Sequence, residues 1–204
     1  MYHLILNSRI GYLLQIVPFI LLAGGVYLLL RRRYLQRHWK PWRSPGNEFF
    51  RWLTVCWLAG LLALVWTPSN LWSSLWYTLL TGQPSDGFGP MFQANINLVP
   101  TFLRRLTGEY TSGSWVRFME LGNLLLFLPF GFLLPFVWKK ARLWRVVLAG
   151  AALSFVIEVG QIVVARSTDI DDLIANTLGA LAGYGLFALV RLISPGTVRR
   201  IQNG

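Results

Sequence analysis

The sequence is poor in cysteine, histidine and acidic residues. Among its 204 residues are one cysteine, Cys56, and two histidines, so a disulfide within the chain and a cysteine-built metal site are excluded. Only eight residues are Asp or Glu against 19 Lys or Arg, and charged residues together make up 13% of the chain. A soluble domain needs more charge to cover its surface. His3 is a lone residue and His38 lies in a basic run, which argues against histidine catalysis.

Long apolar runs are abundant. Hydrophobic residues make up 54% of the chain. Five windows approach the length of about 20 residues that a helix needs to cross about 30 Å of hydrocarbon. They lie near residues 10–30, 50–67, 121–138, 146–165 and 173–192. The sequence therefore predicts an all-α polytopic membrane bundle with five transmembrane helices, forming a single membrane domain over residues 1–204.

The charges alternate between the loops. Basic runs follow the first, third and fifth windows, whereas most acidic residues lie in the other loops. The positive-inside rule then predicts an N-terminus outside and a C-terminus inside the cell. Because the basic runs flank membrane windows, we assign them to topology and predict no nucleic-acid partner.

The long outer loop, residues 68–119, has a helical pattern of its own. Apolar residues recur at helical spacing just after the second window, and Gly82 and Pro84 end the run. Tryptophan is favoured at membrane interfaces. We therefore predict an amphipathic interfacial helix, whose apolar positions are Trp72, Leu75, Trp76, Leu79 and Leu80.

Polar residues share one face in each of the last three spans. Ser154, Glu158 and Gln161 lie on one stripe of the fourth span, and Asp172 and Asn176 on one stripe of the fifth. An ionisable residue in hydrocarbon costs at least a few kcal/mol, so these stripes should face one another. We predict a ligand-binding polar pocket at the outer ends of the spans. Its residues are Glu120, Asn123, Glu158, Gln161, Arg166, Asp169, Asp172 and Asn176.

Each of these residues also has a structural interpretation. Glu158 alone could be a neutral acid that joins two helices, and Asp169 or Asp172 could cap the fifth span. The convergence of three helices at one depth favours a site over packing alone. No resident cofactor or protein-bound metal is predicted, and Mg²⁺ or Ca²⁺ across the outer carboxylates is kept as a minor alternative.

Four segments carry a family resemblance. NLVP (97–100), ELGNLLLFLPFGFLLP (120–135), SFVIEVGQ (154–161) and RSTDIDDLIANTLGALAGYG (166–185) closely resemble the VanZ-like family of bacterial membrane proteins, over about residues 97–190. The resemblance implies a multi-pass protein of the bacterial plasma membrane with a cell-envelope role. The founding member of the family is associated with low-level teicoplanin resistance, and the resemblance supplies no reaction or catalytic residue.

Three functional hypotheses stay open. In the first, the protein lies among membrane lipids and recognises a lipid-linked envelope precursor, a teichoic-acid lipid or a lipoglycopeptide in the outer leaflet. This recognition lowers susceptibility to teicoplanin-type lipoglycopeptides. In the second, a membrane enzyme modifies an envelope lipid or cell-wall precursor with Glu158 or Asp172 as general base. In the third, the chain is a structural or regulatory membrane partner.

Overall fold

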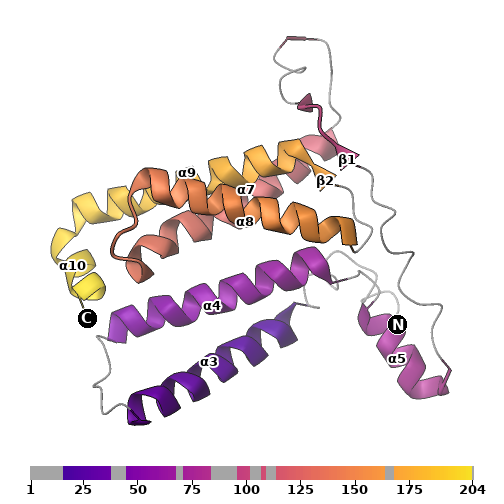
Figure 1. The fold of residues 1–204 in the computed structure, drawn as a ribbon, viewed down its shortest axis with the longest axis horizontal. Helices are drawn as coiled ribbons and strands as arrows, with labels where there is room; N and C mark the ends of the chain where they lie inside the picture. Colours follow the sequence, from indigo (N-terminus) through magenta and orange to yellow (C-terminus); the bar gives the residue numbers. More distant parts are fainter. Residues whose placement is uncertain are drawn as a thin grey trace.

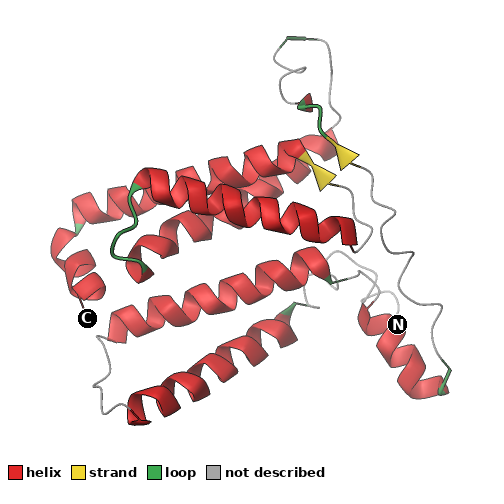
Figure 2. Ribbon diagram, viewed as in Figure 1, coloured by secondary structure: helices red, strands yellow, loops and turns green. Residues whose placement is uncertain are grey.

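The chain folds mainly into helices. A computed structural model describes residues 16–37, 45–67, 71–83, 96–101, 107–108, 114–163 and 168–203. The helices are α3 (Val17–Arg37), α4 (Pro45–Trp66), α5 (Leu71–Thr81), α7 (Ser114–Val137), α8 (Leu143–Val163), α9 (Ile170–Ile193) and α10 (Pro195–Asn203) (Figure 1). Two short strands, β1 (Ile96–Asn97) and β2 (Thr168–Asp169), accompany them (Figure 2).

Four helical segments among the described residues are long and apolar enough to cross a membrane. They are α4, the Glu120–Val137 part of α7, α8 and α9. The predicted helical membrane protein is confirmed to this extent. The expected first span begins outside the described residues, and α3 covers its second part before continuing to Arg37. The count of five spans and the orientation of the two ends stay predictions.

The helices form a bundle in which α7, α8 and α9 lie together and α4 packs against α7 and α8 (Figure 1). Helix α3 packs against α4, and the short α10 contacts α4, α7 and α9. Helix α5 confirms a helix in the long loop, with Leu79 and Leu80 exposed. Its position at a membrane interface stays a prediction.

Helices α7 and α9 approach each other at backbone distance. A Cβ atom added to Gly179 would lie 2.2 Å from the Leu124 carbonyl oxygen, and one added to Gly183 would lie 2.0 Å from that of Leu128. The contact partners advance by four residues on both helices in the same direction, so α7 and α9 run parallel. Small residues every fourth position allow such close packing between membrane helices.

Helix α8 also packs against α9, through Gly150 and Ser154. Gly150 faces α9, because a Cβ there would lie 2.7 Å from the Ala180 side chain. The backbone contact itself is with α7, whose carbonyl groups fill the groove that the glycines leave open. Helical periodicity reveals a small face but not the helix that covers it.

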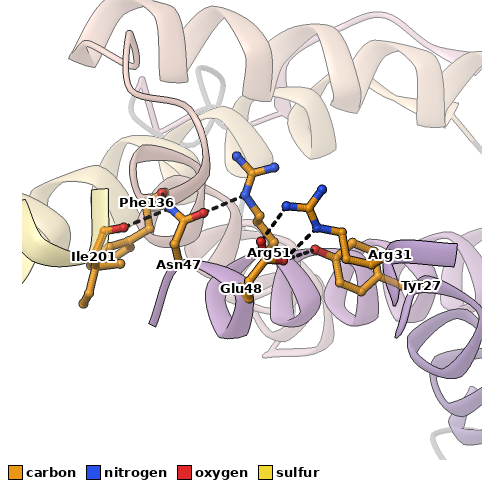
Figure 3. Close-up of polar contacts among 7 residues, drawn as sticks. All are labelled: Tyr27, Arg31, Asn47, Glu48, Arg51, Phe136 and Ile201. Atoms are coloured by element: carbon orange, nitrogen blue, oxygen red, sulfur yellow. Dashed lines mark hydrogen bonds and ion pairs between the residues drawn. The ribbon is translucent and has the colours of Figure 1, made fainter. Parts of the chain in front are cut away.

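Polar side chains join α4, α7 and α10 at one end of the bundle. The Asn47 side-chain amide donates to the Phe136 carbonyl over 3.2 Å and to the Ile201 carbonyl over 2.9 Å (Figure 3). Gln202 donates to the Pro135 carbonyl over 2.9 Å. These carbonyls belong to the last turns of α7 and α10, where a helix has no donors of its own. The contacts therefore satisfy two helix ends and fix α10 against the bundle.

An ion pair joins α3 to α4 at the same end. Arg31 Nη2 lies 2.6 Å from Glu48 Oε1, and Arg31 Nε donates to Glu48 Oε2 over 3.1 Å (Figure 3). The Tyr27 hydroxyl donates to the same carboxylate over 3.2 Å. Sequence analysis assigned no role to Glu48, although an acid that follows a run of arginines was a signal for such a pair. The bidentate geometry holds the described part of α3 against the bundle.

Replacing Gly179 by alanine tests the backbone contact. The new Cβ would meet the Leu124 carbonyl group, so the helices must separate, and we expect the free energy of unfolding to fall by about 1–3 kcal/mol or more. The matched control is Gly185→Ala on the same helix, where an added Cβ meets nothing within 4 Å. Thermal unfolding of both variants in detergent measures the effect, and equal midpoints would contradict the proposed contact.

Candidate functional site

Five acidic side chains gather where α7, α8 and α9 meet, at the end of the bundle opposite Glu48. The Glu158 carboxyl group interacts electrostatically with Asp169 and Asp172. Asp172 interacts in turn with Glu120, Asp169 and Asp171. We call these five residues the acidic cluster. Its members come from three helices and the strand before α9, so only the tertiary fold brings them together.

Glu158 is the buried member that α8 contributes. It is 6% exposed and sits in the last two turns of the helix. Its Oε2 accepts a hydrogen bond from the Asp169 backbone N–H over 3.3 Å, and its backbone carbonyl accepts one from the Thr168 hydroxyl over 3.1 Å. The contacts attach the start of α9 to the end of α8, so Glu158 has a structural partner as well as a place in the cluster.

A two-residue strand pair, which the sequence did not predict, covers this junction. Strand β1 pairs in parallel with β2, with Asn97 opposite Asp169. The Asn97 amide donates to Asp169 Oδ2 over 3.2 Å, while Asp169 Oδ1 accepts from the Asp171 N–H over 3.0 Å as the N-cap of α9. The capping interpretation of Asp169 is therefore what the structure shows. Asn97, part of the NLVP segment, is a contact of the site that sequence analysis left out.

Asp171 is a second residue that the predicted site omitted. It is 5% exposed, and its Oδ2 accepts hydrogen bonds from the Thr101 N–H over 2.9 Å and from the Thr101 hydroxyl. The partners are 70 residues apart, so no local pattern connects them. The position of Asp171 between two predicted site residues was the one available signal. Together with Asn97, this contact draws the NLVP segment onto the start of α9.

Helix α7 contributes a donor to the cluster. The Asn123 side chain hydrogen-bonds the Asp172 carboxylate, and Glu120 lies one turn before Asn123 and acts on Asp172 electrostatically. Both contacts follow from the parallel packing of α7 and α9, which brings their N-terminal turns to the same depth. The predicted meeting of the third and fifth spans at this end is thus present in the structure.

One turn below the cluster, the polar stripes of α8 and α9 meet directly. The Asn176 amide donates to the Ser154 hydroxyl over 2.9 Å, and Asn176 is 5% exposed. Asn176 Oδ1 and Gln161 Oε1 are buried and have no hydrogen-bond partner among the described residues. A buried acceptor without a donor is costly in an apolar interior. Asn176 Oδ1 lies one turn below Asp172 on α9, and Gln161 Oε1 lies one turn beyond Glu158 on α8.

The structure therefore brings most of the predicted site together. Glu120, Asn123, Glu158, Asp169 and Asp172 interact with one another, and Asn176 lies one turn below Asp172. Arg166 lies outside the described residues, so its predicted pairing with this site stays a prediction. Among the described residues no group of three or more Asp, Glu, His or Cys side chains is arranged to hold a metal ion, so the Mg²⁺ or Ca²⁺ alternative gains no geometric support.

Comparison with known families identifies the region that contains this site. The VanZ/LLP1 family model matches residues 54–191. The match begins within α4 and ends near the end of α9, and it contains the whole acidic cluster. No curated protein and no solved structure matches the chain.

Two substitutions of Asp169 separate its capping role from its charge. Asp169→Ala removes the acceptor for the Asp171 N–H and should lower the free energy of unfolding by about 0.5–2 kcal/mol. Asp169→Asn keeps a side-chain oxygen for the cap but replaces the acceptor of the Asn97 amide by a donor, so it should lose less stability than Asp169→Ala. Denaturant unfolding in detergent compares the two variants. If asparagine is as harmful as alanine, the negative charge and the Asn97 contact rather than the cap stabilise this end.

Proposed function

The chain belongs to the VanZ/LLP1 family, and on that premise we propose that it is a membrane protein of the bacterial cell envelope with a recognition function. The acidic cluster recognises a lipid-linked envelope molecule or a lipoglycopeptide in the outer leaflet of the plasma membrane. Binding there lowers the effective concentration or access of teicoplanin-type lipoglycopeptides and so lowers susceptibility to them.

The surplus of hydrogen-bond acceptors at the cluster is the observation that supports this proposal. The Glu158 and Asp172 carboxylates interact with each other, and two further oxygens, on Gln161 and Asn176, are buried with no donor among the described residues. Such a surface is complementary to a ligand that supplies N–H or O–H donors or positive charge. Amino and hydroxyl groups on a sugar or peptide headgroup meet that requirement.

The surroundings of the cluster favour a ligand that is held in the membrane. Helix α8 exposes Phe155, Val156 and Val159 within two turns of Glu158 and Gln161, on a face turned away from the bundle. An apolar chain can lie along such a face without a cost in buried polar groups. A molecule with a polar headgroup and a lipid tail can therefore place its headgroup at the cluster while its tail stays in the hydrocarbon.

An enzymatic function is the second candidate, and the interaction between Glu158 and Asp172 favours it. A carboxylate is a stronger base when a second carboxylate lies nearby, which suits one of the pair to general-base chemistry on a hydroxyl group. The purified protein would then convert a labelled cell-wall precursor or teichoic-acid lipid to a new product. Binding of such a lipid without any conversion supports recognition instead.

Substitutions in the cluster test the proposed function in cells. Glu158→Gln and Asp172→Asn keep the size of each side chain but remove its negative charge. Loss of a charged hydrogen bond costs about 1.5–3 kcal/mol, so ligand affinity should fall about tenfold or more and teicoplanin protection should be lost. The inhibitory teicoplanin concentration is measured in a host without its own copy of the protein, alongside the amount of protein in the membrane.

The matched control is Leu148→Ala, an exposed residue of the same helix ten positions before Glu158 and outside the proposed ligand face. It should leave both protection and membrane abundance unchanged. If the parent chain protects and both charge-neutral variants protect equally well at equal abundance, the acidic cluster is not the recognition site.

A further inference from the structure

A donor-lined depression lies at the C-terminal end of α3. It is shallow and open, with a volume of about 400 Å³, and it is lined by Arg33, Gln36 and Arg37. Residues spaced by three and four share one face of a helix, so the three side chains project together. All three are exposed. Among the described residues none of them has an ion pair or a hydrogen-bond partner.

The neighbouring arginine, Arg31, differs from these three residues because its side chain has partners. Arg31 is committed to the Glu48 carboxylate and also lies over the Tyr34 ring, 5.6 Å from its centroid. Arg31 thus neutralises the acidic side chain that α4 places at this end. No carboxylate lies among the described residues that line the depression with Arg33 and Arg37.

At the end of the predicted first span, the depression falls at the level expected for the lipid headgroups. Leu29 and Leu30 are 63% and 60% exposed, as expected of lipid-facing residues, and the arginine run follows at once. With a helical rise of about 1.5 Å per residue, Arg33 and Arg37 lie roughly 4–11 Å beyond Leu30. The polar layer on each side of the hydrocarbon is about 5–8 Å thick. The depression therefore lies among lipid phosphates when Leu30 reaches the edge of the hydrocarbon.

The side chains that line the depression favour an anionic ligand. Each guanidinium group offers a planar fork that binds two phosphate oxygens, and the Gln36 amide adds a neutral donor between them. We propose that this depression binds the phosphate headgroup of an anionic phospholipid. The site lies at the opposite end of the bundle from the acidic cluster, so it is independent of the proposed recognition function.

Other basic residues at this end support an anionic lipid as the occupant. Lys139, Lys140 and Arg142 lie in the exposed turn between α7 and α8, and Arg191 lies in the last turn of α9. A basic surface next to a membrane attracts anionic lipids in general. The depression adds a defined headgroup position to that general attraction, and this difference makes the proposal testable.

The experiment titrates the full chain, purified in detergent, with phosphatidylglycerol and with phosphatidylcholine, and follows binding by native mass spectrometry. We expect the wild-type chain to retain phosphatidylglycerol in preference to phosphatidylcholine. Arg33→Ala should weaken phosphatidylglycerol binding more than fivefold, beyond the roughly fivefold loss expected when any one charge is removed at a membrane surface. Gln36→Ala should also weaken binding although it leaves the net charge unchanged.

Arg32→Ala is the matched control. Arg32 is exposed, adjacent to Arg33 and equal to it in charge, but it is not among the lining residues. Equal losses in Arg32→Ala and Arg33→Ala, with no loss in Gln36→Ala, would overturn the site and leave only general surface attraction. Arg33→Lys keeps the charge and loses the fork, so unchanged binding in that variant would overturn the bidentate contact.

A competition experiment distinguishes between a lipid and free phosphate as the ligand. Inorganic phosphate should displace phosphatidylglycerol only at concentrations far above that of the lipid, since it lacks the tail held beside Leu29 and Leu30. Displacement at equal concentration would overturn the lipid assignment. Thermal unfolding without added lipid should be the same for all four variants, because every substituted side chain is exposed.

Discussion

The close parallel contact between α7 and α9 is the constraint on which the described structure depends. Gly131, Gly179 and Gly183 remove the side chains that would otherwise hold the two backbones apart. The helices therefore fix each other's axial position, because a carbonyl group that fits against a glycine does not fit against the larger neighbours. With that position fixed, Asn123 of α7 lies beside Asp172 of α9. The acidic cluster is a consequence of this packing.

Keeping several acids together requires donors as well as proximity. Like charges at one end of a bundle repel, and the fold offsets this by directing N–H groups at individual carboxylates. Asp169 caps α9, Asp171 receives the Thr101 amide, and Glu158 receives the amide of Asp169. Most of these donors are backbone groups whose direction is set by β1, β2 and the first turn of α9. The fold therefore holds these carboxylates in fixed positions.

At the opposite end of the bundle, the charged side chains are arranged differently. There the buried carboxylate of Glu48 pairs with Arg31 and accepts a hydrogen bond from Tyr27, and Asn47 donates to the carbonyls that end α7 and α10. These contacts leave other arginines exposed at the same level. Among the described residues, one end of the bundle is thus rich in hydrogen-bond acceptors and the other in basic side chains.

The sequence by itself determined the features that depend on near neighbours along the chain. Hydropathy set the membrane helices, and helical spacing placed Glu158 with Gln161 and Asp172 with Asn176 on single faces, because periodicity is a local property. Spaced motifs also indicated the family, which the match over residues 54–191 confirms. Only the tertiary structure decided which helix covers the glycines of α9, that Thr101 donates to Asp171, and that Arg31 pairs with Glu48. Such pairs join residues far apart in the chain, and their choice depends on the packing of whole helices rather than on any pattern within one of them.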